Sequence, residues 1–305
     1  MSLVGEVAGR VVVVTDSTAA LTSEEADELG IGVVPLHVVI DECEHTEGVD
    51  IDPEQIAEAL CRGRRVSTSR PSPAAMLRCY ERLADAGASA VVSAHLSGQL
   101  SGTCDAAALA AREAPIPVQV VDSGSTGLGL GYAVAAAARL PSAPQAGPQD
   151  VARALGEEIE RRCRATTVLC YVHSLDHLRR GGRIGAAASL LGGALAIKPL
   201  LALRDGHIEP LEKLRTSGRA LSRLTDLGFQ AMEQVSDGTP RAGGVLVAVH
   251  HLDACERAET LAADLLARAE EQLGAGVAQV QVRELPAVLA VHLGPGTVAV
   301  VVAPG

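Results

Sequence analysis

Residues 11–29, which read VVVVTDSTAALTSEEADEL, contain the pattern that organises the chain. Four consecutive valines predict a strand buried on both faces, because the run has no polar side to present to water. Thr22 and Glu25 form a capping box, in which each side chain accepts a backbone N–H at the start of a helix. The stretch therefore predicts a strand, a polar loop and a helix in succession.

The same succession recurs twice further along the chain. Ala90–Val92 are followed by a loop with two glycines and an alanine-rich helix, and Val118–Val121 by Asp122, Ser123 and a helix over about 128–140. Repeated strand–loop–helix units favour a parallel sheet covered by helices on both faces. We therefore predict a three-layer α/β/α domain with a parallel sheet in the N-terminal half.

The C-terminal half follows another pattern after the linker-like sequence PSAPQAGPQ at 141–149. Asp205-Gly206 between two strand-like runs predicts a hairpin. We expect helices over about 149–163 and 254–273, and strands over about 168–172, 196–203, 207–215, 245–249, 278–283, 287–293 and 298–303. The predicted domains are 1–164 and a smaller two-layer α/β domain over 165–305, with a mixed or antiparallel sheet and helices on one side.

Composition excludes several functional classes. A formal net charge of −11 opposes binding to phosphate backbones and to anionic membranes. One Phe, three Tyr and no Trp leave almost no side chains on which bases or sugars could stack. Seven scattered cysteines without a C-x-x-C pair predict reduced thiols. We expect a cytoplasmic protein with no nucleic-acid partner, no integral membrane segment and no metal site.

Hydroxyl side chains gather where the predicted strands end, which is where open parallel sheets bind ligands. They are Thr15, Ser17, Thr18, Ser93, Ser97, Ser101 and Ser123, and a hydroxyl-rich turn spans residues 67–73. These residues are either neutral donors to a ligand or helix caps and turn residues.

The loop at 97–103, SGQLSGT, is the most specific of these segments. Its two glycines allow close approach of the backbone to a ligand, and the following helix presents N–H groups, so a small anion such as a carboxylate fits there. His292, which ends the apolar run 288–291, is either a donor to such a carboxylate or a structural histidine at a strand end. The spacing of the glycines at 127–131 indicates helix packing rather than dinucleotide binding.

Three arginines lie on a glycine turn at 179–183, RRGGR. In an otherwise acidic chain this segment is either a solvated turn or helix-terminus contact, or a docking patch for an acidic partner protein.

Taken in order along the chain, these motifs resemble those of DegV-type proteins, the bacterial fatty-acid-binding proteins. The matching segments are Val14-Thr15-Asp16-Ser17-Thr18, Thr68-Ser69-Arg70-Pro71-Ser72-Pro73, His95-Leu96-Ser97 through Leu100-Ser101-Gly102-Thr103, Asp122-Ser123, Leu178 through Gly181-Gly182-Arg183-Ile184, Ile197-Lys198-Pro199, Asp205-Gly206, Lys213-Leu214-Arg215-Thr216 and His292-Leu293-Gly294-Pro295-Gly296.

The resemblance implies a non-catalytic protein that binds a long-chain fatty acid as its ligand and has no cofactor. It implies delivery of the fatty acid to a separate ATP-dependent kinase, which makes acyl phosphate for phospholipid synthesis. Carried over by motif, the residues that bind the carboxylate are Ser67, Thr68, Ser97, Gly98 and His292. Arg215 is then expected near the head group, and Arg183 is expected to face the kinase.

Two alternatives remain open. One is an enzyme, either a small-molecule kinase-like protein or a serine hydrolase that uses Ser97 and His292; the absence of G-x-S-x-G argues against the hydrolase. The other is a regulatory interaction module that acts through residues 179–183.

Overall fold

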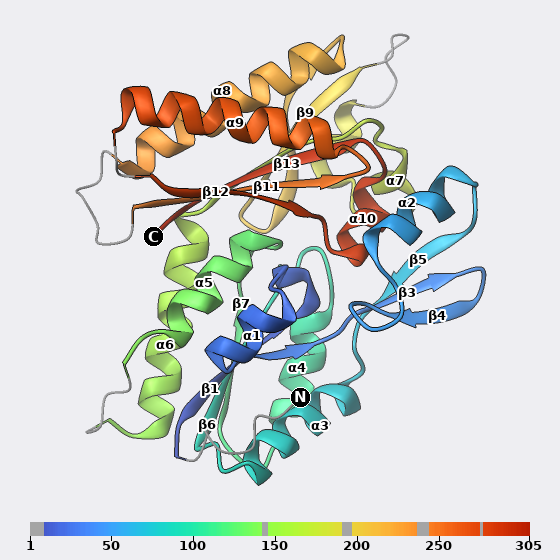
Figure 1. Cartoon of the computed structure of the whole chain (residues 1–305). Helices are drawn as coiled ribbons and strands as arrows, with labels where there is room; N and C mark the ends of the chain where they lie inside the picture. The colour runs from blue at the N-terminus through green and yellow to red at the C-terminus, as the bar shows by residue number, and fades with distance from the viewer. Residues whose placement is uncertain (1–8, 142–145, 191–196, 237–243, 275–276) are drawn as a thin grey trace. The chain divides into compact units, whose positions relative to one another are not determined.

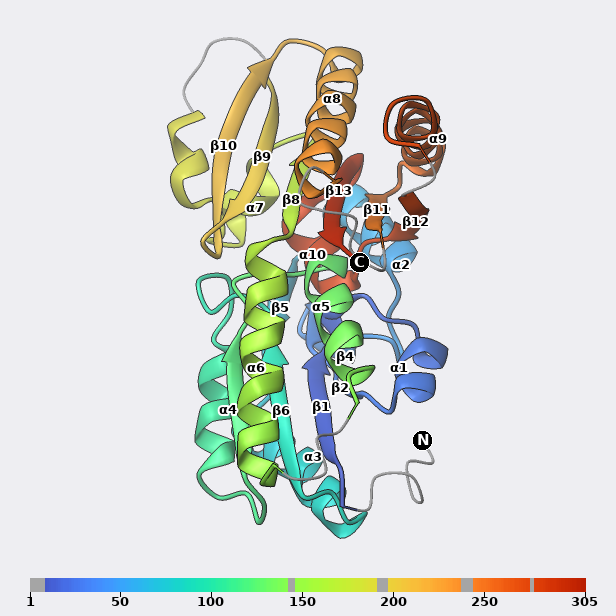
Figure 2. The same cartoon turned by 90° about the vertical axis from the view of Figure 1, so that its left-hand side faces the viewer.

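The computed structural model describes residues 9–141, 146–190, 197–236, 244–274 and 277–305 (Figures 1 and 2). Residues 142–145 of the expected linker, and residue 196 at the start of an expected strand, lie outside this described part.

The chain divides into two compact units, and neither unit is one continuous stretch. The first unit comprises Met1–His37 and Ser69–Cys163, and the second comprises Val38–Thr68 and Arg164–Gly305. The predicted N-terminal domain, 1–164, includes residues 38–68, which group here with the C-terminal residues. No shift in composition marks that segment, because its membership depends on tertiary contacts such as the hydrogen bond from the Val288 amide to Glu47 (2.8 Å).

A parallel four-stranded sheet forms the centre of the first unit, as predicted. Its strands, in the order β2-β1-β6-β7, are Gly32–Val34, Val11–Asp16, Ala90–His95 and Val118–Asp122. Every neighbouring pair runs parallel. All six residues of β6 are buried, including the polar Ser93 and His95.

Helices cover both faces of this sheet and complete the predicted α/β/α layers. Val13 packs in one core with residues of α1 (Ser23–Leu29), α5 (Leu128–Ala138) and α6 (Pro148–Arg164). Its neighbours Val12 and Val14 pack in the opposite core with α3 (Pro73–Asp85) and α4 (Thr103–Ala111). The capping box of Thr22 and Glu25 is present at the start of α1. A short 3-10 helix, η1, spans Ser17–Ala19.

The second unit contains a mixed six-stranded sheet, also as predicted. Its order is β10-β9-β8-β13-β11-β12, with the bounds His207–Leu214, Lys198–Arg204, Thr167–Tyr171, Thr297–Pro304, Val245–Leu252 and Val277–Glu284. Only β11 and β12 pair in parallel among these strands. Asp205 and Gly206 have φ angles of 47° and 78°, the pattern of a type I′ hairpin turn.

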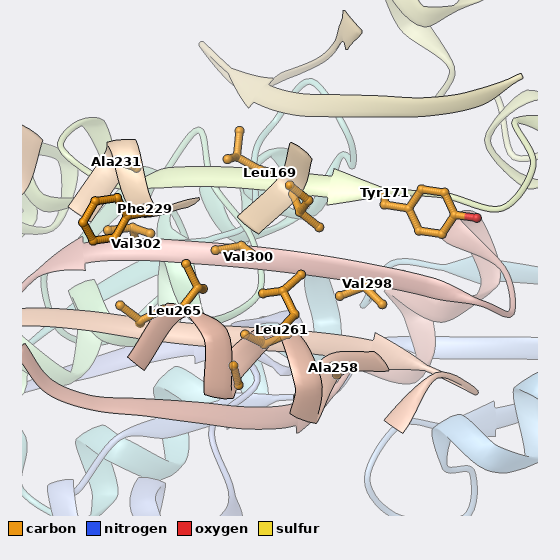
Figure 3. Packing of buried hydrophobic residues seen from close by; sticks show 14 of the residues in the cluster. Leu169, Tyr171, Phe229, Ala231, Ala258, Leu261, Leu265, Val298, Val300 and Val302 are labelled. Atoms are coloured by element: carbon orange, nitrogen blue, oxygen red, sulfur yellow. The ribbon is translucent and has the colours of Figure 1, made fainter. Parts of the chain in front are cut away.

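The main core of the second unit lies between this sheet and two long helices, α8 (Ser217–Ser236) and α9 (Cys255–Gln272). Figure 3 shows Leu261 and Leu265 of α9 beside Val298 and Val300 of β13. The opposite face is not bare, because α7 (Asp176–Arg180) and a second 3-10 helix, η2 (Gly185–Leu190), pack there against Leu201. The expectation of helices on one side therefore holds for the long helices only.

Residues 38–68 contribute a small sheet and a helix. The sheet has the order β4-β3-β5, with the bounds Cys43–Thr46, His37–Ile40 and Val66–Ser69, and α2 spans Pro53–Cys61. Ser67 and Thr68, predicted in a turn, thus lie on a strand. Residues 70–72 connect β5 to α3, and the Ser72 side chain caps that helix.

The predicted strand at 287–293 is wrong, because these residues form the helix α10 (Ala287–Leu293). Ala287 through Val291 are all buried, so the segment shows neither helical nor strand periodicity and its sequence is ambiguous. Pro286 before it and Gly294 after it, at a φ of 79°, are the only boundary signals. His292 therefore lies in the last turn of a helix rather than at the end of a strand.

No helix in the described part of the chain has both the length and the apolar composition that crossing a bilayer requires.

Candidate functional site

A hydrogen bond between Thr68 and His292 forms the centre of the candidate site in the second unit. Thr68 Oγ1, on β5, lies 2.9 Å from His292 Nε2, on α10, although the residues are 224 positions apart in the sequence. Both line a pocket of about 480 Å³, a volume in the range of about 300–1,000 Å³ typical of small-molecule sites. Its other lining residues are Leu60, Gly63, Arg64, Arg65, Val66, Ser67, His177, Arg180, Gly181, Arg183 and Val291. We call this the Thr68–His292 pocket.

His292 is held in its neutral form. Burial, assisted by the positive charge of Arg183, lowers the pKa of His292 to about 4. Its Nδ1 is buried without a hydrogen-bond partner. If the ring proton were on Nδ1, a buried N–H group would lack an acceptor, so the proton is assigned to Nε2. With that tautomer His292 donates to Thr68 Oγ1, and the Thr68 hydroxyl keeps its own proton for a ligand.

Two glycines set the position of the two histidines that line the pocket. A Cβ added to Gly181, just after α7, would collide with Nδ1 of His292. A Cβ added to Gly294, just after α10, would collide with the ring of His177 on α7. Each helix thus places a histidine against the glycine that ends the other helix. Larger side chains at either glycine would separate α7 from α10.

We expect the Gly181→Ala variant to disrupt the Thr68–His292 hydrogen bond while leaving the backbone unstrained. The φ of Gly181 is −76°, which alanine adopts readily, so the change is opposed by the collision with His292 and, to a lesser degree, by a close approach of 3.3 Å to the His177 carbonyl oxygen. In NMR spectra the side-chain resonances of His292 should shift. Gly218→Ala, at the start of α8 and with open space around the added methyl, is the matched control. Equal perturbation of His292 in both variants would contradict this account.

Positive charge dominates the Thr68–His292 pocket. Among the described residues, four arginines and two histidines line it, and no carboxylate does. Arg64 forms an ion pair with Asp41 at 2.7 Å, and Arg183 donates to the Gly181 carbonyl oxygen at 2.6 Å. Burial and the charge of Arg180 lower the pKa of His177. The pocket is therefore suited to an anion.

The first unit contains a buried polar chain at the carboxyl ends of β1 and β6. His95 Nδ1 lies 3.0 Å from Asp16 Oδ2, and His95 Nε2 lies 2.8 Å from Ser93 Oγ. Ser93 Oγ is in turn 2.8 Å from the Tyr80 hydroxyl, whose pKa burial raises to about 12. Asp16, Ser93, His95 and Tyr80 are all 0% exposed. The connectivity resembles a Ser–His–Asp triad, but its members are fully buried.

Ser97 and Gly98 lie in the first unit, where both already have internal partners. Ser97 Oγ accepts from the Gln99 amide at 3.1 Å, and the Ser97 amide donates to the Ser125 carbonyl oxygen at 2.9 Å. The Gly98 amide donates to both carboxyl oxygens of Asp122, at 3.0 and 3.1 Å. These bonds fit the interpretation of the segment as turn structure. The carboxylate-binding roles of Ser97 and Gly98 stay predictions.

Three hydroxyl groups near this loop are buried without a hydrogen-bond partner: Thr15 Oγ1, Ser125 Oγ and Thr126 Oγ1. Thr15 is in β1, and the other two follow β7, so all belong to the carboxyl end of the parallel sheet. Buried polar atoms of this kind normally have partners. This is the sheet edge at which the sequence predicted neutral donors.

Of the site residues predicted from the sequence, Ser67, Thr68, Arg183 and His292 line one pocket. Arg215 is exposed just after β10 and does not line it. Sequence reasoning missed Arg64, Arg65 and His177. The run RGRR at 62–65, directly before the Ser67-Thr68 pair, is a signal that could have indicated the two arginines.

Within the described residues, no group of three or more histidine, cysteine, aspartate or glutamate side chains is arranged to hold a metal ion.

The chain is thus a two-unit α/β protein, with a parallel and a mixed sheet, and it has relatives with the same organisation. A family model described as "Uncharacterised protein, DegV family" matches residues 10–305. The chain belongs to the DegV family. It is 46% identical over 294 residues to a DegV domain-containing protein of Streptomyces coelicolor, a match that covers 96% of this chain and 98% of the relative.

Solved structures of the family have the same fold. A fatty-acid-binding DegV family protein from Thermus thermophilus matches with a TM-score of 0.84 and 33% identity, covering 97% of this chain and 100% of that one. DegV from Bacillus subtilis, a fatty-acid-binding protein, matches with a TM-score of 0.82 and 28% identity, covering 98% and 100% of the two chains.

Proposed function

We propose that the protein binds a long-chain fatty acid and that Thr68 and His292 hold its carboxylate. The observation that carries the proposal is the Thr68–His292 hydrogen bond of 2.9 Å inside a pocket whose described lining residues include four arginines and no carboxylate. The similarity to the fatty-acid-binding DegV proteins of Thermus thermophilus and Bacillus subtilis supports it. Ser67, Ser97 and Gly98 are predicted to contribute further donors.

Neutral donors suit a carboxylate that must remain reactive. The Thr68 hydroxyl can donate a charge-assisted hydrogen bond to a carboxylate oxygen, and neutral His292 fixes that hydroxyl by donating to its oxygen. Neither partner cancels the negative charge of the carboxylate. The carboxylate oxygen therefore keeps the electron density that it needs to attack a phosphorus atom.

Most of the binding free energy is expected to come from the acyl tail. Each buried CH₂ group contributes about 0.8 kcal/mol, so a long-chain tail contributes on the order of 10 kcal/mol. A hydrogen bond to a charged group contributes about 1.5–3 kcal/mol. Affinity should therefore follow tail length, while the Thr68–His292 pair sets the orientation of the head group.

We further propose that the protein is a carrier rather than an enzyme and acts in the cytoplasm. A separate ATP-dependent kinase would phosphorylate the bound carboxylate for phospholipid metabolism. In that step a carboxylate oxygen forms a bond to the terminal phosphorus of ATP, the bond to the bridging oxygen breaks, and ADP leaves. Arg183, which lines the pocket, is proposed to face the kinase, and Arg215 to lie near the head group.

The test combines lipid identification with one isosteric substitution. Native mass spectrometry of the purified protein should show a co-purified fatty acid, and Thr68→Val should weaken fatty-acid binding about tenfold or more through loss of a charge-assisted hydrogen bond. Thr260→Val, an exposed threonine on α9, is the control. If the protein purified from a lipid-replete host carried no fatty acid at all, that result would contradict the proposed fatty-acid binding. A bound fatty acid with unchanged affinity in Thr68→Val would contradict the head-group assignment.

A further inference from the structure

Lysine is rare in this chain, which has only Lys198 and Lys213 beside 24 arginines. An arginine guanidinium keeps its proton at all accessible pH values, so it does not act as a nucleophile. A lysine amine becomes a nucleophile when it loses its proton, which burial and neighbouring cations promote. The two lysines are therefore the only side chains whose amines could form an amide bond with a reagent.

Lys198 begins β9, and its ammonium group contacts His173, in the loop that follows β8. Lys198 Nζ lies 3.2 Å from Nε2 and 3.4 Å from Nδ1 of the His173 ring, and it donates to the His173 carbonyl oxygen at 3.2 Å. The other charged group that acts on Lys198 is Arg257 on α9, and no carboxylate within the described residues forms an ion pair with this lysine. None of these three residues lines the Thr68–His292 pocket.

The surroundings favour the neutral forms of both Lys198 and His173. Partial burial and the positive charge of Arg257 lower the pKa of Lys198. Partial burial and the charges of Lys198 and Arg257 lower the pKa of His173. A neutral imidazole has one ring nitrogen with a free lone pair, so His173 can accept a proton from the Lys198 ammonium. A lysine that loses its proton more readily than usual thus lies against a base.

The position and charge of this pair indicate the kind of reagent that it would meet. Lys198 is half-buried and His173 is exposed, so a small molecule can approach the amine from solvent. The positive charge of Arg257 favours an anionic reagent over a neutral one. Acyl phosphates combine a negative charge with a carbonyl carbon that amines attack, and their phosphate is a good leaving group.

We propose that Lys198 is a site of Nε-acylation by acyl phosphates, with His173 as the base that receives a proton from its ammonium group. The amine nitrogen forms a bond to the carbonyl carbon, the bond from that carbon to the bridging oxygen breaks, and phosphate leaves with the electron pair. Lys198 gives one proton to His173 before the attack and a second to the departing phosphate. The products are an amide, hydrogen phosphate and protonated His173. This inference does not depend on the fatty-acid proposal.

The experiment compares the two lysines within the same molecule. The whole folded protein is incubated with acetyl phosphate at near-neutral pH, and peptide mass spectrometry measures the acetylation rate at each lysine. Lys198 should react at least about fivefold faster than Lys213, because assistance by a general base typically contributes about 10²–10⁴-fold. Lys213, on β10, is the more exposed of the two, so accessibility alone predicts the opposite order.

His173→Gln tests the role of the base, because glutamine can accept a hydrogen bond but cannot take up the proton. This variant should slow acetylation of Lys198 about tenfold or more and leave the rate at Lys213 unchanged. His207→Gln, which replaces an exposed histidine on β10, is the matched control and should change neither rate. In the unmodified protein, the rate at Lys198 should also rise at lower pH than the rate at Lys213, since the pKa of Lys198 is lowered.

The outcomes that would overturn the proposal are specific. Equal rates at the two lysines, or faster reaction of Lys213, would show that the surroundings of Lys198 do not activate its amine. Faster reaction of Lys198 that His173→Gln leaves unchanged would remove His173 as the base. If His173→Gln failed to fold by circular dichroism, the pH profiles of the unmodified protein would decide: identical profiles for the two lysines would refute the proposal, and an earlier rise for Lys198 would support it.

Discussion

Replacing Asp16 by alanine is expected to lower the free energy of unfolding by about 3–5 kcal/mol, the usual cost of removing one partner from a buried polar cluster. Its two carboxyl oxygens accept four hydrogen bonds, from the Thr18 amide (3.1 Å), the Thr18 hydroxyl (2.6 Å), the Leu96 amide (2.9 Å) and His95 Nδ1 (3.0 Å). Asp16 and His95 are both 0% exposed. Alanine would leave these donors buried and unsatisfied, with no route to water.

Urea unfolding followed by circular dichroism measures this loss, and the control is Asp122→Ala. Asp122 occupies the equivalent place at the end of β7 and also accepts backbone hydrogen bonds, from Gly98 and Gly124, but it is exposed. Water can replace it, so its substitution should cost about 1 kcal/mol. Similar losses for Asp16→Ala and Asp122→Ala would show that burial of the Asp16 cluster does not matter for stability.

Gly131→Ala should destabilise the first unit by close to 3 kcal/mol, at the upper end of the usual cost of overpacking. Gly131 lies in α5, and an added Cβ would collide with the carbonyl oxygen of Ala19 and approach Leu128 Cδ2 to 3.0 Å. The Ala19 carbonyl belongs to the backbone of η1, which cannot move without displacing the loop after β1. The substitution therefore forces α5 away from the sheet.

The sign of this effect makes the prediction specific. Alanine is favoured over glycine inside a helix by up to about 1 kcal/mol, so helix propensity alone predicts stabilisation. Gly218→Ala in α8, where the added methyl meets no atom within 4 Å, should show unchanged or slightly raised stability. Chemical unfolding of both variants checks the difference. A stabilised Gly131→Ala variant would mean that α5 does not pack as closely on η1 as described.

The candidate site shows how far local sequence signals extend. The Ser67-Thr68 pair and His292 could be named from the order of motifs, and the β9–β10 hairpin from Asp205-Gly206 alone. The pairing of Thr68 with His292 could not be derived, because it depends on β5 and α10, which are distant in sequence. The arginines at 64 and 65 were missed because a short basic run in isolation looks like solvated surface.

The amino-acid sequence by itself determined many of the local elements and the parallel and mixed kinds of sheet. The signals for these elements are an unbroken valine run, a capping box and an Asp-Gly turn. Each depends on interactions between residues a few positions apart, so it can be recognised in the sequence. Only the tertiary structure decided that α10 is a helix, that residues 38–68 group with the C-terminal unit, and that Gly181 lies against His292. Burial and steric fit between distant segments settle such features, and no local pattern encodes them.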